Sequence, residues 1–255
     1  RAIKILNKVV GDEVSVKRFE AEARILAKLR HPNIVEVTDA GTASEGRFIV
    51  MELLHGESLG DLLERVPFEE RKAQFVEQLI RIVDEICGGL EFAHDNHVVH
   101  RDLKPGNIFL HKEENGKIVP KILDFGVAKQ IDLTQSNLTV DGDIFGTRGY
   151  IPPERYRGAE PDIRTDIFSL GAVMYYCLTN TLLLDGKGSD NAIKDAFNLN
   201  YKVPSIKGVN SLVDDRLDEI CLKALEWDPK NRYQSAREFR EALDTIIIKE
   251  DETTS

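Results

Sequence analysis

Two short motifs at a fixed separation constrain this 255-residue chain more than any other feature of its sequence. The first reads His-Arg-Asp-Leu-Lys-Pro-Gly-Asn and spans residues 100–107. It places an acid, Asp102, on a tight loop, followed by a cation, Lys104, and a side-chain amide, Asn107. The second motif, Asp-Phe-Gly, begins at Asp124, at the end of a predicted strand and seventeen residues beyond Asn107. Each motif alone is weak evidence, but the two in this order and at this separation are highly specific.

The groups in these motifs suit the transfer of a phosphoryl group from a metal-bound nucleotide. That reaction needs a carboxylate that orients a hydroxyl, hard oxygen ligands for Mg²⁺, and a positive charge beside the moving phosphoryl group. Asp102, Lys104, Asn107 and Asp124 include a residue of each kind. The sequence therefore predicts a phosphotransferase site where the two motifs meet.

The order of the predicted elements indicates a first part that is small and rich in strands. Residues 1–6, 34–37 and 48–53 have the pattern of strands, and a helical period predicts an amphipathic helix over 15–29. A glycine-bounded turn is predicted at 41–46.

From residue 58 onward the apolar spacing becomes mainly helical. The predicted helices lie at 75–93, 164–179, 190–198, 211–227 and 234–247. Short strands are predicted around 98–100, 107–110 and 119–123, with a turn at Asn115-Gly116. We therefore expect an α+β fold of two lobes: a partial, β-rich small lobe at 1–54, a larger helical lobe at 55–248, and a polar tail at 249–255.

Charge and composition narrow the range of partners and environments. With 34 basic and 44 acidic side chains the formal net charge is −10, and there is no basic stripe, so nucleic acid is not an expected partner. Three widely spaced cysteines argue against a disulfide framework and fit a reducing compartment, so the expected location is the cytoplasm. No apolar run approaches the ~20 residues that span a bilayer. A membrane anchor is therefore expected only in a segment outside this chain.

With both motifs in place, the chain resembles the catalytic domain of the protein kinase family over essentially its whole length. The form Asp-Leu-Lys-Pro-x-Asn, together with Gly-Thr-Arg-Gly-Tyr at 146–150, resembles the serine/threonine branch, and the whole pattern is similar to bacterial receptor-like, or Hanks-type, members. The resemblance implies a bilobal fold and transfer of the γ-phosphoryl group of ATP, with Mg²⁺, to serine or threonine hydroxyls of protein substrates. It also implies that two copies of the chain could form a homodimer in which one copy phosphorylates the other.

The resemblance assigns a role to each polar residue of the two motifs. Asp102 would orient the substrate hydroxyl, and Lys104 would neutralise the transferring phosphoryl group. Asn107 and Asp124 would hold Mg²⁺. Thr147, in the loop that resembles the family's substrate platform, would bond to Asp102 and Lys104.

The resemblance implies that the predicted first strand and first helix carry the residues that bind the phosphates of the nucleotide. The tripeptide Ala-Ile-Lys at 2–4 resembles the end of the family's Val-Ala-Ile-Lys strand, so Lys4 would hold the α- and β-phosphates. Glu22 is the preferred helical partner of Lys4, and Glu20 is the alternative. Because Arg1 begins in mid-strand, a glycine-rich strand pair is expected upstream.

The adenine ring is expected between the two lobes. The segment that starts at Met51 resembles the family's hinge, with Met51 as gatekeeper behind the pocket. The carbonyl group of Glu52 and the amide of Leu54 would contact the ring, and Ala2 and Phe109 would close on it from above and below. Without the resemblance, the apolar residues among these would be read as ordinary core.

Further residues resemble the scaffold of the family. Asp166 would anchor the backbone of the catalytic loop, and Arg232 would pair with Glu154. The Pro-Pro-Glu at 152–154 departs from the commoner Ala-Pro-Glu but keeps the glutamate. An apolar column would link the lobes through Val37, Leu26, Phe125 and His100. Four other histidines lack metal-ligand spacing and are expected to be ordinary polar residues: His31, His94, His97 and His111.

The resemblance also predicts a regulatory phosphorylation in the activation segment, residues 124–154. A phosphate of about −1.5 to −2 charge would pair with Arg101 and order the segment. The candidate acceptors are Thr134, Ser136 and Thr139. Thr139 is preferred because it lies eight residues before Thr147, and Asp141 would already supply part of the charge.

Two alternatives remain open from the sequence. One is a catalytically inactive kinase-fold scaffold that binds partner proteins, and the other is a small-molecule phosphotransferase of related fold. The residues that inactive relatives typically lose are all present: Lys4, Glu22, Asp102, Asn107 and Asp124. The substrate-platform loop, Asp166 and Arg232 argue against the small-molecule enzyme.

Overall fold

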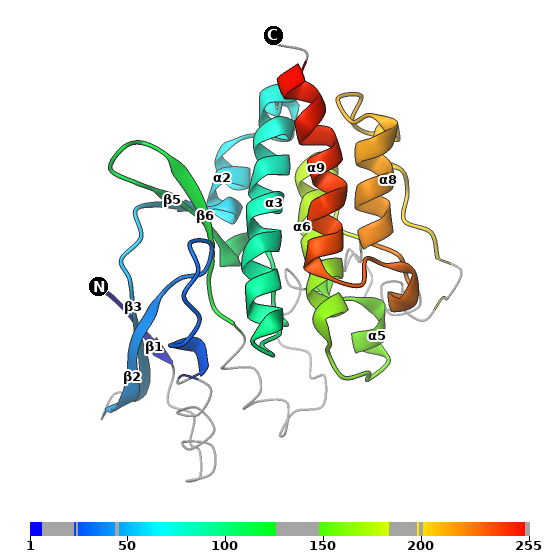
Figure 1. The fold of residues 1–255 in the computed structure, drawn as a ribbon. Coiled ribbons are helices and arrows are strands. Elements are labelled where there is room, and N and C mark those ends of the chain that lie inside the picture. Colours follow the sequence, from blue (N-terminus) through cyan, green and yellow to red (C-terminus); the bar gives the residue numbers. More distant parts are fainter. Residues whose placement is uncertain are drawn as a thin grey trace.

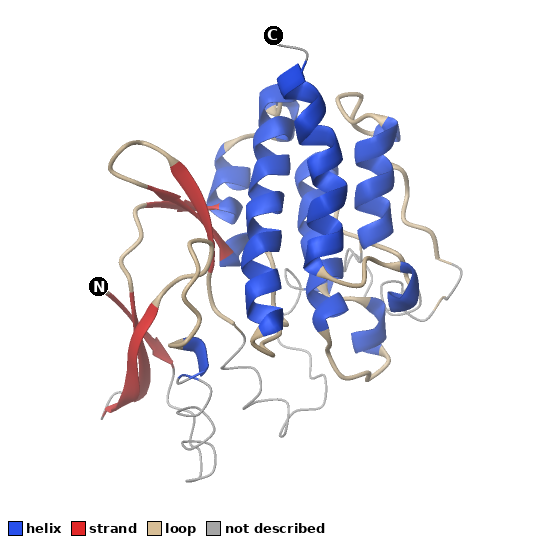
Figure 2. Ribbon diagram, viewed as in Figure 1, coloured by secondary structure: helices blue, strands red, loops and turns tan. Residues whose placement is uncertain are grey.

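The computed structural model describes residues 1–6, 23, 25–43, 46–125, 148–183, 198 and 201–252 (Figure 1). In this part of the chain, two small β-sheets lie on the same side of a bundle of α-helices (Figure 2). The first sheet comes from the N-terminal residues, and the second lies next to helices of the bundle. The arrangement is the two-lobed α+β fold that the sequence predicts.

The first sheet is antiparallel, with the strand order β1-β3-β2. Its strands are β1 (Ala2–Leu6), β2 (Val37–Ala43) and β3 (Gly46–Met51). Both β2 and β3 extend into the segment 41–46 that the sequence predicts as a turn. A Cβ atom at Gly41 would lie 2.9 Å from Cζ of Phe48, its partner across the strands. The glycine therefore makes room for an aromatic ring within the strand pair, and does not mark a turn.

The predicted strand at 34–37 is mostly irregular in the structure. Ile34 forms an isolated parallel bridge with Ile122. The amide of Val35 donates to the carbonyl oxygen of Ile122 at 3.0 Å. The amide of Ile122 donates to the carbonyl oxygen of Asn33 at 2.8 Å. Because these backbone groups bond to the second sheet, they do not extend the first.

The second sheet is a hairpin with one short added strand. Its strands, in the order β4-β5-β6, are β4 (Gly56–Ser58), β5 (Ile108–Lys112) and β6 (Ile118–Ile122). Gly116 has a φ of 86° in the predicted turn between β5 and β6, a conformation that favours glycine. The strand predicted at 98–100 is wrong, because the amide of His100 donates at 2.8 Å to the carboxylate of Asp166 and not to a neighbouring strand.

Helices make up most of the remaining described chain. The α-helices are α2 (Leu59–Arg65), α3 (Ala73–Asp95), α5 (Pro153–Tyr156), α6 (Ile163–Thr179), α8 (Asp215–Ala224) and α9 (Ala236–Glu252). Short 3₁₀ turns occur at Phe68–Glu70, Pro105–Asn107, Arg148–Tyr150, Ile206–Gly208 and Pro229–Asn231. Reciprocal capping boxes start α2, with Ser58 and Asp61, and α6, with Asp162 and Thr165.

Several helix boundaries differ from the apolar pattern. The helix α8 starts later than the predicted residue 211, because the side chain of Asp214 accepts a hydrogen bond from the amide of Leu217 at 2.8 Å and caps the helix there. The helix α9 continues to Glu252, so it enters the segment 249–255 that the sequence assigns to a polar tail.

Two predicted helices lie largely outside the described residues. Of the helix predicted at 15–29, Ala23, Ile25 and Leu26 are helical, and residues 27–28 form a turn. Within the described part, this helix therefore ends earlier than predicted. The helix predicted at 190–198 falls outside the described residues except for Asn198, which is irregular.

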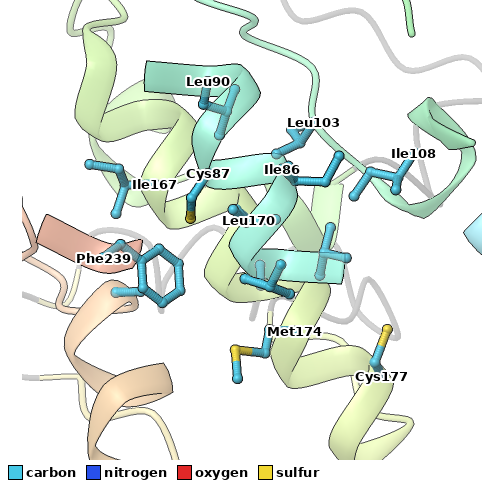
Figure 3. Packing of buried hydrophobic residues seen from close by; sticks show 14 of the residues in the cluster. Ile86, Cys87, Leu90, Leu103, Ile108, Ile167, Leu170, Met174, Cys177 and Phe239 are labelled. Carbon is cyan, nitrogen blue, oxygen red and sulfur yellow. The ribbon is translucent and has the colours of Figure 1, made fainter. Parts of the chain in front are cut away.

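The hydrophobic core lies between α3, α6 and α9 (Figure 3). Side chains from all three helices are 0% exposed: Ile86, Cys87, Leu90, Ile167, Leu170, Met174 and Phe239. All three cysteines are free and buried, and burial raises the pKa of the Cys177 thiol to about 12. Among the described residues, no helix combines the length and the apolar character needed to cross a membrane.

Candidate active site

The backbone of the loop that follows α3 is held by Asp166, whose side chain is fully buried in the first turn of α6. Its Oδ2 accepts the amide N–H of His100 at 2.8 Å, and its Oδ1 accepts that of Arg101 at 2.8 Å. Arg101 has a φ of 71°, a left-handed conformation. Such a conformation costs a non-glycine residue about 1–3 kcal/mol and persists only when its surroundings impose it. The predicted anchoring of the loop by Asp166 is confirmed.

Three predicted catalytic side chains belong to this loop and lie close to one another: Asp102, Lys104 and Asn107. The Nδ2 of Asn107 donates to the backbone carbonyl oxygen of Asp102 at 2.8 Å and lies 3.5 Å from its carboxylate Oδ2. The Nζ of Lys104 lies 3.8 Å from the same Oδ2. Because the amide nitrogen of Asn107 contacts Asp102, its carbonyl oxygen is the atom that could ligate a cation.

Asp124 follows β6, and backbone pairing places it beside the loop. The amide of Leu123 donates to the carbonyl oxygen of Asn107 at 2.8 Å. Asp124 has a φ of 51°, so the chain turns sharply where the strand ends. One backbone hydrogen bond therefore brings the segments of the two predicted Mg²⁺ ligands together.

Lys4 reaches the same acid from the other lobe. Its Nζ lies 2.6 Å from Oδ2 of Asp124, and both side chains are partly exposed. Its neighbours in β1, Ile3 and Ile5, are 65% and 60% exposed, so Lys4 projects from the opposite face of the sheet. The predicted phosphate-binding lysine and a predicted Mg²⁺ ligand are thus in direct contact.

His100 and Phe125 pack against each other, as the predicted column requires. Their ring centroids are 4.9 Å apart, and the residues are 0% and 5% exposed. The other two members of the column are buried in the same core cluster: Leu26 and Val37. His100 Nε2 also lies 2.7 Å from the carbonyl oxygen of Leu123, and the amide of Asp102 donates to its Nδ1 at 3.2 Å. His100 is therefore a packing residue that also links the two motifs.

The residues predicted to surround adenine lie on both sheets and on the segment between them. Met51 ends β3 and pairs with Ala2 of β1. Phe109 lies half-buried in β5, and Leu54 lies half-buried between the sheets. Their contacts with a nucleotide remain a prediction.

The side chain of Glu52 makes contacts that sequence reasoning missed. Its Oε1 accepts the amide of Glu36 at 2.8 Å and the ammonium group of Lys121 at 2.9 Å. Lys121 lies in β6, and the amide of Glu52 in turn donates to the carbonyl oxygen of Glu36 at 3.0 Å. Glu52 thus joins the segment before β2 to the second sheet. No local pattern predicts this pair, because 69 residues separate Glu52 from Lys121.

The predicted pair of Glu154 and Arg232 is confirmed. The guanidinium group of Arg232 donates from Nη1 to Oε1 of Glu154 at 2.8 Å and from Nη2 to Oε2 at 2.7 Å. The side chain of Glu154 is 11% exposed and that of Arg232 is 0% exposed. The guanidinium group also lies 4.7 Å from the ring centroid of Phe168. The departure, Pro152 in place of alanine, is accommodated because this residue is the N-cap of α5, with φ −71° and ψ 153°, backbone angles that proline readily adopts.

Several predicted residues lie outside the described part of the chain. These are Glu20 and Glu22, in the segment where the sequence predicts the first helix, and Thr134, Ser136, Thr139, Asp141 and Thr147, in the activation segment. Their roles remain predictions.

The donor atoms of the site fit a magnesium ion bound with a nucleotide. Mg²⁺ takes oxygen ligands and is usually held by one or two carboxylates together with substrate phosphates and water. The carboxylate of Asp124 and the amide oxygen of Asn107 are such ligands. Within the described residues, no group of three or more His, Cys, Asp or Glu side chains is placed to hold a metal by itself.

The two-lobed α+β fold, with an anchored acidic loop on one lobe and a lysine-bearing strand on the other, defines a phosphotransferase of the kinase type. The chain belongs to the protein kinase domain family, whose model matches residues 1–244. Members of this family use ATP, typically with Mg²⁺.

Curated relatives extend beyond the region that they share with this chain. A probable serine/threonine-protein kinase of Clostridium perfringens is 35% identical over 247 residues, which cover 96% of this chain and 34% of that protein. The probable serine/threonine-protein kinase PknB of Lactococcus lactis is 33% identical over 241 residues, which cover 93% and 36%. The chain therefore spans little more than a third of the length of these relatives.

A solved structure supports the assignment of the fold. The crystal structure of the PknI kinase domain of Mycobacterium tuberculosis matches with a TM-score of 0.70 at 24% sequence identity. The match covers 95% of this chain and 84% of that chain.

Proposed function

We propose that this chain is the catalytic domain of an active serine/threonine protein kinase, which transfers the γ-phosphoryl group of Mg-ATP to serine or threonine hydroxyls of proteins. The observation that carries the proposal is the convergence of Asp102, Lys104 and Asn107 with Asp124 and Lys4, which come from both lobes. The bacterial serine/threonine-protein kinases among its relatives support the same substrate class.

Each residue of this group has a distinct task in the proposed reaction. Asp102 accepts a hydrogen bond from the substrate hydroxyl and orients its oxygen toward the γ-phosphorus. Lys104, 3.8 Å from the carboxylate of Asp102, stabilises the charge of the transferring phosphoryl group. Asn107 and Asp124 hold Mg²⁺, which when bound neutralises charge on the phosphate oxygens. Lys4 binds the α- and β-phosphates and exchanges its contact with Asp124 for phosphate oxygens.

Adenine is placed between Ala2 and Phe109 in this proposal. The backbone groups of Glu52 and Leu54 are its polar contacts, and Met51 lies behind the ring. The pairing of Ala2 with Met51 in the first sheet supports this arrangement, because it puts two of the expected apolar contacts side by side.

The proposed partners are proteins with accessible serine or threonine residues. A second copy of the chain would be one such substrate, modified in trans at Thr139, with Thr147 helping to bind the acceptor. The three buried free thiols fit a reducing compartment, and we place the domain in the cytoplasm.

Transfer of labelled phosphate tests the proposal. The full-length protein, incubated with γ-labelled ATP, Mg²⁺ and a basic test protein, is expected to label serine or threonine, and chelation of Mg²⁺ is expected to stop the labelling. Asp102→Asn should lower kcat by at least the ~10²-fold typical of a positioned proton acceptor. A protein that binds partners but transfers no phosphate would instead be the inactive scaffold.

A further inference from the structure

The segment that joins the two sheets has free backbone groups at its centre. It is the connector of residues 52–55, between β3 and β4 (Figure 1). Glu52, at its start, is held by the two side-chain contacts described above. The backbone groups of Leu53 and Leu54 form no hydrogen bond with any other described residue. These two residues therefore keep their donors and acceptors available for a ligand.

The far end of the connector is held at His55. The amide of Lys112, in β5, donates to the carbonyl oxygen of His55 at 2.7 Å. In a regular antiparallel pair, the amide of His55 would return a hydrogen bond to the carbonyl oxygen of Lys112. It donates instead to Nδ1 of His111 at 3.1 Å. An imidazole ring thus takes the place of a backbone acceptor.

The state of the His111 ring follows from these contacts. Its Nδ1 also lies 3.2 Å from the carbonyl oxygen of His55, but that oxygen already accepts the amide of Lys112. Because a backbone amide can only donate, Nδ1 must accept the amide of His55. The neutral ring with its proton on Nε2 therefore fits the site.

Gly56 fixes the direction in which the chain leaves the connector. Its φ is 133°, and a Cβ atom there would lie 2.1 Å from the carbonyl oxygen of Leu110. A residue with a side chain could not approach β5 so closely. This approach keeps His55 within reach of the half-buried His111 side chain. The connector is thus held at both ends, with two free residues between them.

The edge of the base decides which nucleotide such a connector accepts. In the proposed arrangement, the carbonyl oxygen of Glu52 accepts a hydrogen bond and the amide of Leu54 donates one. Adenine offers them a donor, its N6 amino group, and an acceptor, N1. Guanine offers the reverse, with O6 as an acceptor and N1–H as a donor. Guanine fits only if the connector turns its peptide groups or moves along the base, and its two held ends oppose both changes.

We propose that His111 is a positioning residue that makes the site select adenine over guanine nucleotides, because its imidazole holds the connector at His55. The side chain acts through the backbone of the connector and does not touch the base. Lys121 acts in the same way at the other end, through the carboxylate of Glu52. The inference rests on the proposed kinase function, since it uses the adenine contacts of that proposal.

Two substitutions at His111 isolate the acceptor from the rest of the side chain. In His111→Asn, the side-chain oxygen lies about where Nδ1 of histidine does, whereas His111→Leu removes the acceptor. Because His55 is exposed, water can bond to its amide in the Leu variant, and the fold should be kept. Lys121→Met releases the opposite end of the connector and is a second, independent variant.

The affinities for Mg-ATP and Mg-GTP, measured in the full-length protein by competition with a fluorescent ATP analogue, test the proposal. A hydrogen bond of this kind changes an equilibrium constant by about 2-fold to 12-fold. The ratio of Kd for GTP to Kd for ATP should therefore fall about 3-fold or more in His111→Leu and keep its wild-type value in His111→Asn. Lys121→Met should lower the same ratio. Equal ratios in the folded Leu and Asn variants would overturn the inference.

Inosine triphosphate shows whether the hydrogen-bonding edge of the base is read. It carries the O6 and N1–H of guanine without the 2-amino group, so it should bind the wild-type protein more weakly than ATP does. Affinity equal to that for ATP would also overturn the inference. Binding needs no catalysis, so a wild-type protein that selects ATP but transfers no phosphate would refute the kinase proposal alone. A wild-type protein that binds no nucleotide would refute both.

Discussion

The ammonium group of Lys4 lies 2.6 Å from the carboxylate of Asp124, although 120 residues separate them. One residue lies in the first strand of the chain and the other follows the last strand of the second sheet. The contact therefore spans the two lobes and lies beside the loop that carries Asp102. Because both side chains are partly exposed, the pair contributes about 1 kcal/mol or less to stability, and its importance lies in the site.

Replacement of Asp124 should therefore remove activity and leave the fold intact. Asp124→Asn takes away a carboxylate ligand of Mg²⁺ and the charge that Lys4 contacts. Magnesium-dependent transfer of labelled phosphate should disappear, while the melting temperature stays close to that of the wild-type protein. Near-normal phosphate transfer by this variant would show that Asp124 is not a metal ligand.

Loss of the buried ion pair between Glu154 and Arg232 should lower the stability of the fold, unlike the replacement of Asp124. Arg232→Gln leaves the carboxylate of Glu154 buried without its cation and should lower the free energy of unfolding by about 3–5 kcal/mol. Arg237→Gln is the matched control, because Arg237 contacts Glu91 with its own side chain 63% exposed. Urea unfolding of both variants measures the free energy of unfolding that each one loses. Equal losses of stability would mean that burial does not decide the strength of these pairs.

The contact between Glu52 and Lys121 should also contribute to stability. Lys121→Met leaves the half-buried carboxylate of Glu52 without its cation and should lower the free energy of unfolding by about 1–3 kcal/mol. Lys117→Met is the control, since Lys117 is exposed in the same hairpin and should change stability by about 0.5 kcal/mol or less. Thermal or urea unfolding distinguishes the two. An unchanged Lys121→Met variant would show that the ion pair contributes nothing.

Phosphorylation of the activation segment is tested by mass spectrometry after incubation with ATP. Phosphate is expected on Thr139, and Thr139→Ala should slow the transfer of phosphate to other proteins, because the added charge would pair with Arg101 and order the segment. Alanine at Thr134, Ser136 and Thr139 together should have the same effect or a larger one. Unchanged activity in that triple variant would mean that Asp141 suffices or that no switch exists.

Much of the site could be predicted because its parts lie close together in sequence. Asp102, Lys104 and Asn107 lie within a single short loop, residues 102–107, so their spacing can be seen in the sequence without a structure. The anchoring of the loop by Asp166 could be predicted only from the resemblance to kinases, since no local pattern links a residue in α6 to the backbone of His100.

The sequence alone determined the order of the lobes, most helices of the larger one, and the residue types of the site. Periodicity and motif spacing are local properties of the chain. Only the tertiary structure decided that β2 extends through Gly41, that Lys121 contacts Glu52, and that His94 contacts Asp166. These outcomes depend on which distant side chains come within a few ångströms of one another. Hydrogen bonds and ion pairs act only over such distances, so the sequence pattern around His94 resembles that of any polar residue near a helix end.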